Sequence, residues 1–174
     1  NSNLEGKVVL VTGGAGGIGS VISKSFAKQG ARVIIHYNNS KDNAEKISKQ
    51  IDGLAVNADL TDPKQTKELF KHVIEKEGKI DICIANAGKY PKDYAPLWEI
   101  ESSRWDNTIS TNLSLAFNTS RYFLKHASET KKGSLVLIGS TAGIYGEAGH
   151  ADYAAAKGAI TSGLLRTLKN DAAL

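Results

Sequence analysis

The fold is decided by residues 7–19, which read KVVLVT over Lys7–Thr12 and TGGAGGIG over Thr12–Gly19. Residues 8–11 are apolar with no polar alternation, which is typical of a strand in a parallel sheet that is covered on both faces. A glycine-rich turn follows directly, and a helical pattern then runs from about residue 17 to residue 29. This succession of strand, glycine turn and helix predicts the first unit of a doubly wound α/β fold.

The rest of the chain continues the alternation. Further strands are expected at residues 32–37, 54–58, 80–85 and 134–138. Helices are expected at 41–51, at 63–77, from Ser102 or Ser103 to about 129, and from about 152 to the end, with a loop at 89–100. Asp62 is a predicted N-cap, followed by Pro63, and Gln65 has the spacing of a capping box. We therefore expect a Rossmann-like doubly wound parallel sheet of order 3-2-1-4-5 in one domain, residues 1–174.

Composition excludes several classes of protein. The 174 residues carry a formal charge of +4 without a basic stripe, so no nucleic-acid partner is expected. No apolar run has the length of a membrane span, and we expect a cytoplasmic protein without a membrane partner. The single cysteine, Cys83, fits a buried strand, and the four histidines lack metal-ligand spacing, so no metal site is expected.

The glycine turn is the candidate ligand-binding loop. A turn from a strand into a helix aims free N–H groups and the positive end of the helix outward, where a pyrophosphate can bind. Gly13 and Gly17 would let the backbone approach phosphates, and Gly19 would allow close packing of the helix. The alternative is a tight turn without a ligand. The spacing T-G-x-x-x-G-x-G differs from G-x-G-x-x-G, and no Gly-Lys-Ser/Thr follows, which disfavours a P-loop nucleotidase.

Tyr153 and Lys157 lie four residues apart at the start of the last predicted helix, so they share one of its faces. A neighbouring ammonium stabilises a phenolate, which makes such a tyrosine a candidate proton donor and acceptor. Tyr37 and Lys41 have the same spacing, but Tyr37 ends a predicted strand and lacks the helical register. Ser140 ends the fifth predicted strand, 13 residues before Tyr153, and its hydroxyl is a candidate hydrogen-bond donor to a substrate oxygen.

These motifs together resemble the short-chain dehydrogenase/reductase family, and within it the 3-oxoacyl-(acyl carrier protein) reductases and sugar dehydrogenases. The matching positions are the glycine turn, Asp59 and Leu60 after the third strand, Asn86-Ala87-Gly88 after the fourth, and Asn112, Ser140, Tyr153 and Lys157. The resemblance covers residues 7 to about 169; because family members usually continue further, it implies a chain that is incomplete at its C-terminus.

The resemblance implies an NAD(P)-dependent oxidoreductase that interconverts an alcohol and a ketone. Tyr153 would be the general acid and base, Lys157 would assist it and hold the nicotinamide ribose, Ser140 would orient the carbonyl, and Asn112 would hold a water. Cofactor contacts are expected from Gly13, Gly16, Gly17, Ile18, Gly19, Tyr37, Asn38, Asn39, Ser40, Asp59, Leu60, Asn86, Ala87, Gly88, Tyr153 and Lys157. Substrate contacts are expected from Ser140, Ala142, Tyr145 and Tyr153, with Gly146 a further candidate, although a plain loop at 139–149 is an equal alternative.

The end of the second predicted strand favours NADP(H) over NAD(H). An NAD-selective site usually places an acid there to accept a hydrogen bond from the ribose 2′-OH. This sequence has Tyr37 at that position and no acid before Asp42. Asn38, Asn39 and Ser40 can donate to a 2′-phosphate, although an ordinary polar turn is the alternative interpretation.

Two further expectations concern partners. The resemblance implies a homotetramer or homodimer, with Phe117, Tyr122, Phe123, Leu164 and Leu165 either at subunit contacts or in the core. The alternative to an enzyme is a dinucleotide-binding sensor or interaction module without turnover. A complete Ser/Tyr/Lys/Asn set favours the enzyme, because a binding module has no need of it.

Overall fold

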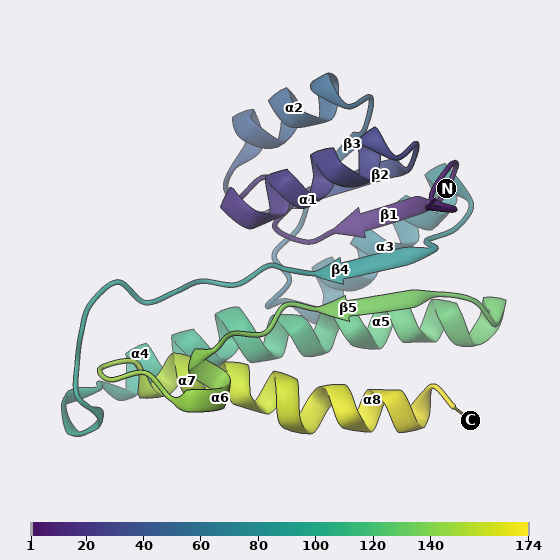
Figure 1. Cartoon of the computed structure of the whole chain (residues 1–174). Coiled ribbons are helices and arrows are strands. Elements are labelled where there is room, and N and C mark those ends of the chain that lie inside the picture. Colours follow the sequence, from purple (N-terminus) through teal and green to yellow (C-terminus); the bar gives the residue numbers. More distant parts are fainter. Residues whose placement is uncertain (1, 174) are drawn as a thin grey trace. The chain divides into compact units, whose positions relative to one another are not determined.

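The computed structural model, which describes residues 2–173, contains a five-stranded parallel sheet (Figure 1). The strands are β1 (Val8–Val11), β2 (Arg32–Tyr37), β3 (Leu54–Asn57), β4 (Ile82–Ala85) and β5 (Ser134–Leu137), in the order β3-β2-β1-β4-β5. This order confirms the prediction. β1 pairs in parallel with β2 on one side and with β4 on the other, and Val9, Leu10 and Val11 have no exposed area. Burial on both faces explains the uninterrupted apolar run.

The described chain divides into two compact units. The first comprises residues 2–87 and 118–136 and holds nearly all of the sheet. The second comprises residues 88–117 and 137–173 and is mainly helical.

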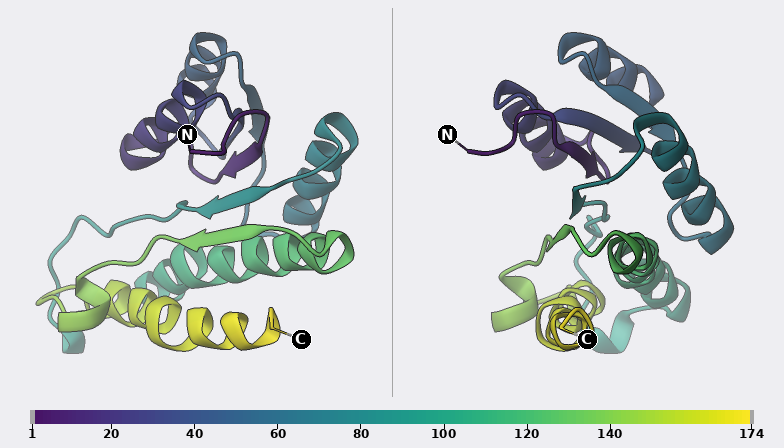
Figure 2. Two further views of the ribbon diagram at one scale, coloured as in Figure 1. Left: turned by 45° about the vertical axis from the view of Figure 1, so that its right-hand side comes forward. Right: turned by 90° about the vertical axis from the view of Figure 1, so that its right-hand side faces the viewer.

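Helices cover the sheet of the first unit. In Figure 2, α1 (Gly17–Lys28) and α2 (Lys41–Gln50) lie on one face, and α3 (Pro63–Glu77) lies on the other. The end of α5 (Leu115–Thr130) packs with α3, since the rings of Phe70 and Tyr122 lie 6.2 Å apart. Phe123 is 1 % exposed. Tyr122 and Phe123, two of the five candidates for subunit contacts, therefore pack within this unit.

The start of α3 follows its predicted cap with one difference. The Asp62 side chain accepts a hydrogen bond from the N–H of Lys64 at 2.8 Å, and Pro63 is the first helical residue. In a capping box, the Gln65 side chain would accept a hydrogen bond from the N–H of Asp62. Gln65 instead accepts from the N–H of Asp59 at 3.0 Å, because the N–H of Asp62 already donates to the carbonyl of Asp59. The cap thereby also holds the segment that follows β3.

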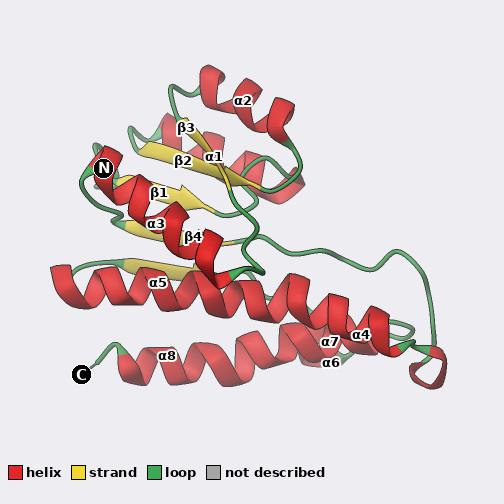
Figure 3. Ribbon diagram, turned by 180° about the vertical axis from the view of Figure 1, so that it is seen from behind, coloured by secondary structure: helices red, strands yellow, loops and turns green. Residues whose placement is uncertain are grey.

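The second unit contains η1 (Leu97–Glu99), α4 (Ser102–Ile109), η2 (Ser110–Ser114), the first residues of α5, α6 (Ala142–Tyr145), α7 (Ala151–Gly158), η3 (Ala159–Leu164) and α8 (Leu165–Asp171), drawn in red in Figure 3. Both predicted long helices are present, but each contains a π-helical segment, η2 in one and η3 in the other. Periodicity alone does not reveal such segments, because they add residues without ending the helix. Among residues 2–173, no helix combines the length and apolar character needed to cross a membrane.

The glycine-rich segment 139–149, for which a plain loop was one of the two expectations, contains the short helix α6. Its cause is close packing. A Cβ on Gly143 would lie 2.5 Å from the backbone nitrogen of Gly158, so the missing side chain lets α6 approach α7 at backbone distance.

A buried ion pair joins α4 to the start of α7. The Asp152 carboxylate is fully buried and accepts hydrogen bonds from Arg104 at 3.0 and 3.2 Å and from Thr108 at 2.8 Å. Arg104 also donates to the carbonyls of Asp93 and Gly149. Burial by itself would raise the pKa of the Asp152 carboxyl, but the hydrogen bonds from Arg104 and Thr108 outweigh it and lower that pKa. This network fixes the residue directly before Tyr153.

Removal of Arg104 should therefore destabilise the protein. Arg104→Ala leaves a buried carboxylate without its cation, and we expect the free energy of unfolding to fall by about 3 kcal/mol in urea titrations at pH 7. Because the folded-state pKa of Asp152 is lowered, the contribution is present above the unfolded carboxyl pKa of about 4 and is lost as the pH falls through the folded value. Arg166→Ala, at an exposed position on α8, is the matched control. Equal effects of the two substitutions at pH 7 would contradict a stabilising network.

Candidate functional site

The glycine turn of the first unit is held by its neighbours. Gly13 has a φ of +60°, which favours glycine, and its N–H donates to Nδ1 of His36 at 3.0 Å. The N–H of Gly14 donates to the carbonyl of His36, and that of Gly16 donates to the carbonyl of Gly13. A Cβ on Gly13 would lie 3.1 Å from the Cα of Ala87. Gly13 thus permits a tight turn, while its own N–H is directed at His36.

The donors that remain for an anion are those that open α1. Its N-cap is Gly16, with no side-chain cap and no acidic residue in the first turn. A Cβ on Gly17 would meet no atom within 4 Å, and Ile18 is 65 % exposed. A Cβ on Gly19 would collide with the carbonyl oxygen of Gly13 and lie 2.8 Å from Nδ2 of Asn86. The turn is therefore a close-packed base under an open, uncapped helix N-terminus, which fits the pyrophosphate of a dinucleotide.

Thr12 ties the end of β1 to the end of β4. Its hydroxyl oxygen accepts from the N–H groups of Asn86 and Ala87, each at 2.9 Å. The Asn86 amide in turn donates to the carbonyl of Thr12 at 2.8 Å. The predicted cofactor residues Asn86 and Ala87 are thus brought beside the glycine turn.

The ends of β2 and β3 also meet. The Asn57 amide donates to the carbonyls of Tyr37 at 3.1 Å and of Asn38 at 2.6 Å. Asn38, Asn39 and Ser40 are exposed, and Ser40 is the N-cap of α2 without a side-chain cap bond. The predicted ribose-recognition residues therefore form an accessible polar turn.

The two predicted residues after β3 have partners within the first unit. Asp59 accepts from both the N–H and the hydroxyl of Thr61. Leu60 is buried, and its carbonyl accepts from Asn118 at 2.9 Å. Asp59 is thus engaged in its own turn.

In the second unit, α7 carries Tyr153 and Lys157 one turn apart, as predicted. The Lys157 ammonium lies 5.8 Å from the centroid of the Tyr153 ring. Lys157 is only 4 % exposed, and its ammonium donates to the carbonyl of Ile138 at 2.9 Å. Burial lowers the pKa of Lys157. A desolvated cation beside a phenol ring is suited to stabilise negative charge on that phenol.

Asn112 lies in the π-helical segment η2 and is 1 % exposed. Its amide nitrogen donates to the carbonyls of Lys89 and Thr108, and its oxygen accepts from the N–H of Lys89 at 3.3 Å. A Cβ on Gly88 would lie 2.8 Å from the Asn112 oxygen and 3.6 Å from the Lys157 nitrogen. Gly88, Asn112 and Lys157 therefore converge, and Asn112 keeps a lone pair for a water.

Ser140 lies at the start of the turn that leads into α6. Its hydroxyl oxygen accepts from the N–H of Ala142 at 3.2 Å, which leaves its own O–H free to donate. Of the other predicted substrate contacts, Ala142 is buried and Tyr145 is 84 % exposed. Gly146, also exposed, has a φ of +77° and ends α6.

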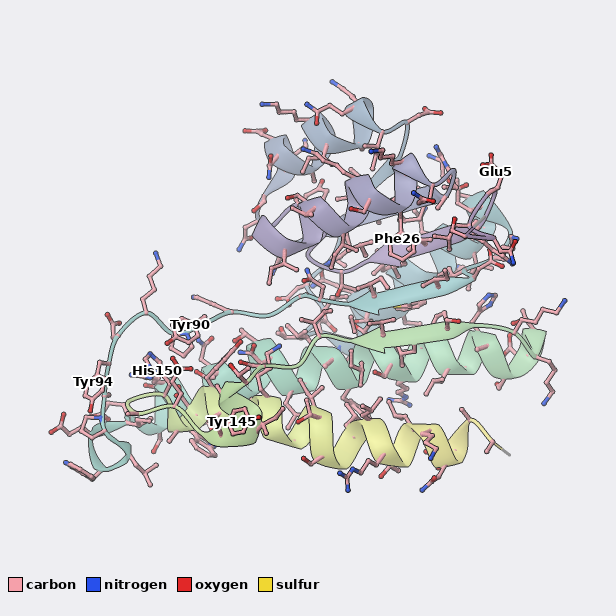
Figure 4. All side chains as sticks on the ribbon, viewed as in Figure 1. Glu5, Phe26, Tyr90, Tyr94, Tyr145 and His150 are labelled. Carbon is pink, nitrogen blue, oxygen red and sulfur yellow. The ribbon has the colours of Figure 1, made fainter. Side chains whose placement is uncertain are left out.

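Tyr90 contacts Tyr153, and His150 contacts Tyr90, although neither Tyr90 nor His150 belongs to a motif predicted from the sequence. Tyr90 packs edge-on against Tyr153, with ring centroids 5.0 Å apart. It also stacks on His150, with ring centroids 4.7 Å apart (Figure 4). Its hydroxyl donates to Glu147 at 2.7 Å, a bond that raises the pKa of Tyr90. Tyr90 lies two residues after Gly88 and His150 three before Tyr153, so proximity to the two motifs was the available signal.

Tyr90 also borders a cavity. This cavity of about 640 Å³ in the second unit is lined by the 89–93 segment and by residues of α4 and η2, without Tyr153. Within the described residues, no three His, Cys, Asp or Glu side chains are grouped to hold a metal ion.

Residues 7–174 match the family model described as short chain dehydrogenase. The 3-oxoacyl-[acyl-carrier-protein] reductase FabG of Thermotoga maritima is 38 % identical over 162 residues, which cover 90 % of this chain and 65 % of that protein. The protein of the same name from Escherichia coli K12 is 34 % identical, with coverages of 89 % and 63 %. A solved structure of an NAD⁺-bound xylitol dehydrogenase has a TM-score of 0.92 at 28 % identity, with 99 % of this chain and 67 % of that one covered.

The chain spans less than two thirds of the length of these two reductases. The match to the family model nevertheless extends over both compact units, including the glycine turn and the helix that carries Tyr153 and Lys157. The chain belongs to the short-chain dehydrogenase family.

Proposed function

We propose that the protein is an NAD(P)-dependent oxidoreductase that interconverts an alcohol and a ketone. The observation that carries this proposal is the buried Lys157 ammonium, 5.8 Å from the ring of Tyr153 on the same face of α7. When bound, the nicotinamide ring supplies or accepts the hydride. The protein must then supply or accept one proton at the substrate oxygen, and Tyr153 is the group we assign to that task.

Three residues assist Tyr153. Lys157 stabilises negative charge on its phenol through the space between them. Ser140, whose oxygen is occupied by the Ala142 N–H, donates its O–H to the substrate oxygen and orients the carbonyl. After Tyr153 has given its proton to the substrate oxygen, Lys157 passes a proton to the phenolate, and a water held by the Asn112 oxygen near Gly88 and Lys157 returns one to the lysine. The glycine turn and the uncapped start of α1 bind the pyrophosphate.

NADP(H) is the favoured cofactor. The turn at Asn38–Ser40 offers exposed amide and hydroxyl donors, and the next acid is Asp42, in the first turn of α2. A carboxylate at position 37 would repel a 2′-phosphate, whereas the tyrosine at this position carries no charge that would do so.

The substrate is a small carbonyl compound or alcohol. A 3-oxoacyl thioester and a sugar or polyol are the two classes supported by the names of the similar proteins. Steady-state assays of both classes with NADPH and NADH test the function. Binding of the dinucleotide without turnover of any substrate would favour a sensor instead.

A homodimer or homotetramer in the cytoplasm remains part of the proposal. Phe117 and Leu165, both in the second unit, are 48 % and 46 % exposed and are available for subunit contacts. A monomeric mass by light scattering would contradict the assembly.

Tyr153→Phe should reduce kcat by about 10²-fold or more, since only the transferable proton is removed. The dissociation constant for NADP⁺, measured by calorimetry, should stay within about twofold of the wild type. Tyr94→Phe removes the hydroxyl of an exposed tyrosine in the same unit and should leave kcat unchanged. Near-normal turnover in Tyr153→Phe would refute the role of the phenol.

Lys157→Met should separate activity from stability. We expect kcat to fall about 10²-fold or more, because the cation beside Tyr153 is lost. Burial lowers the pKa of Lys157, so at any pH below the pKa of the unfolded lysine the folded state is destabilised by holding the charged side chain. An apolar side chain avoids this cost and should leave the free energy of unfolding at pH 7 unchanged or higher. A loss of stability that parallels the loss of activity would indicate a structural lysine.

Tyr37→Asp should shift cofactor preference towards NADH. The carboxylate would accept from a ribose 2′-OH and repel a 2′-phosphate, and we expect the ratio of kcat/KM values for NADPH and NADH to fall about tenfold, equivalent to about 1.4 kcal/mol. Tyr37→Phe keeps the ring without the charge and is the control. A wild-type enzyme that already prefers NADH tenfold would overturn the NADP(H) assignment.

A further inference from the structure

His36, the penultimate residue of β2, occupies a position that the proposed reaction does not use. Its side chain is 2 % exposed, yet both ring nitrogens have partners in the first unit. Nδ1 lies 3.0 Å from the backbone nitrogen of Gly13, and Nε2 lies 3.0 Å from the carbonyl oxygen of Ala58. One imidazole therefore connects the segment after β1 to the segment after β3.

The partners of His36 determine its protonation. A carbonyl oxygen only accepts, so Nε2 must carry the proton. A backbone N–H only donates, so Nδ1 must present its lone pair. The ring is therefore neutral, in a single tautomer. Burial lowers the pKa of His36 to about 4, outweighing the bond to Ala58 and the charge of Asp59, so this form persists at neutral pH.

His36 holds two successive amides of the glycine turn. Its side chain takes the N–H of Gly13 and its carbonyl takes the N–H of Gly14. Gly13 has the positive φ, and its carbonyl accepts from Gly16, the N-cap of α1. The orientation of Gly13 thus sets where the open N–H groups of α1 point.

We propose that His36 is a positioning residue for the dinucleotide, acting through Nδ1 on the N–H of Gly13. This inference rests on the proposed function, in which the glycine turn binds the NAD(P) pyrophosphate. A histidine that merely filled the core would contribute to stability but not specifically to cofactor affinity.

Two polar substitutions distinguish the two nitrogens. His36→Asn keeps an acceptor where Nδ1 stands, whereas His36→Gln keeps an N–H donor where Nε2 stands and has no acceptor at the Nδ1 position, where Gly13 donates. His36→Leu removes both. His126→Leu is the matched control, because His126 is also buried in the first unit and its Nε2 accepts the N–H of Ile80, just before β4, at the opposite end of the strands from the glycine turn.

The readouts are the dissociation constants for NADP⁺ and NAD⁺ by calorimetry, the free energy of unfolding, and kcat with KM for the cofactor. We expect His36→Asn to bind within about threefold of the wild type, and His36→Gln to bind about tenfold more weakly, because the Gly13 N–H loses its acceptor. KM for the cofactor should follow the dissociation constant while kcat stays within about twofold. His126→Leu should lose stability but keep its affinity.

Equal affinities of His36→Asn and His36→Gln would overturn the positioning role, as would a fall in kcat at unchanged affinity. If His36→Leu does not fold, the two polar variants still decide the question. A wild-type protein that binds neither dinucleotide would overturn the proposed function together with this inference, whereas wild-type binding with indistinguishable variants would overturn the inference alone.

Discussion

β1 carries backbone hydrogen bonds to strands on both of its sides, and the position of the glycine turn depends on that pairing. A strand with no exposed area at Val9, Leu10 and Val11 cannot shift without breaking two ladders at once. Thr12 extends this rigidity towards β4, through bonds to Asn86 and Ala87, and His36 extends it towards β3. The ends of four strands are thereby held together by two buried side chains, and every polar atom of these side chains makes a hydrogen bond. A turn that must present N–H groups to an anion needs such support, since glycines alone provide none.

Most of the fold could be predicted from the sequence, because strong periodic patterns and end signals agree. The buried run at 8–11, the cap at Asp62 and the left-handed Gly78 that ends α3 are local features that one sequence reveals. The π-helical segments were not predictable, since a helix that gains a residue keeps its composition. The α6 helix was missed because it depends on contact between Gly143 and Gly158, two residues whose proximity exists only in the folded unit.

The candidate site shows the same division. Tyr153, Lys157, Ser140 and Asn112 were identified by spacing and by resemblance, and in the structure Lys157 lies near Tyr153 while Gly88 brings Asn112 near Lys157. The contacts that hold these side chains in place could not be predicted from the sequence. The Ile138 carbonyl that accepts from the Lys157 ammonium belongs to another segment. Tyr90 stacks on His150, 60 residues further along the chain, and packs edge-on against Tyr153. Such contacts depend on tertiary packing, which leaves no periodic pattern in the chain.

Cys83 allows the opening of the pair β1 and β4 to be measured by thiol labelling. It is the single cysteine in the sequence, it lies in β4 opposite Leu10 of β1, and it has no exposed area. Burial raises the pKa of its thiol, and thiol reagents attack the thiolate. Alkylation therefore has to wait until β4 separates from its neighbours. The rate of labelling thus measures how often the strands beneath the glycine turn open, so the unmodified protein contains its own reporter of local unfolding.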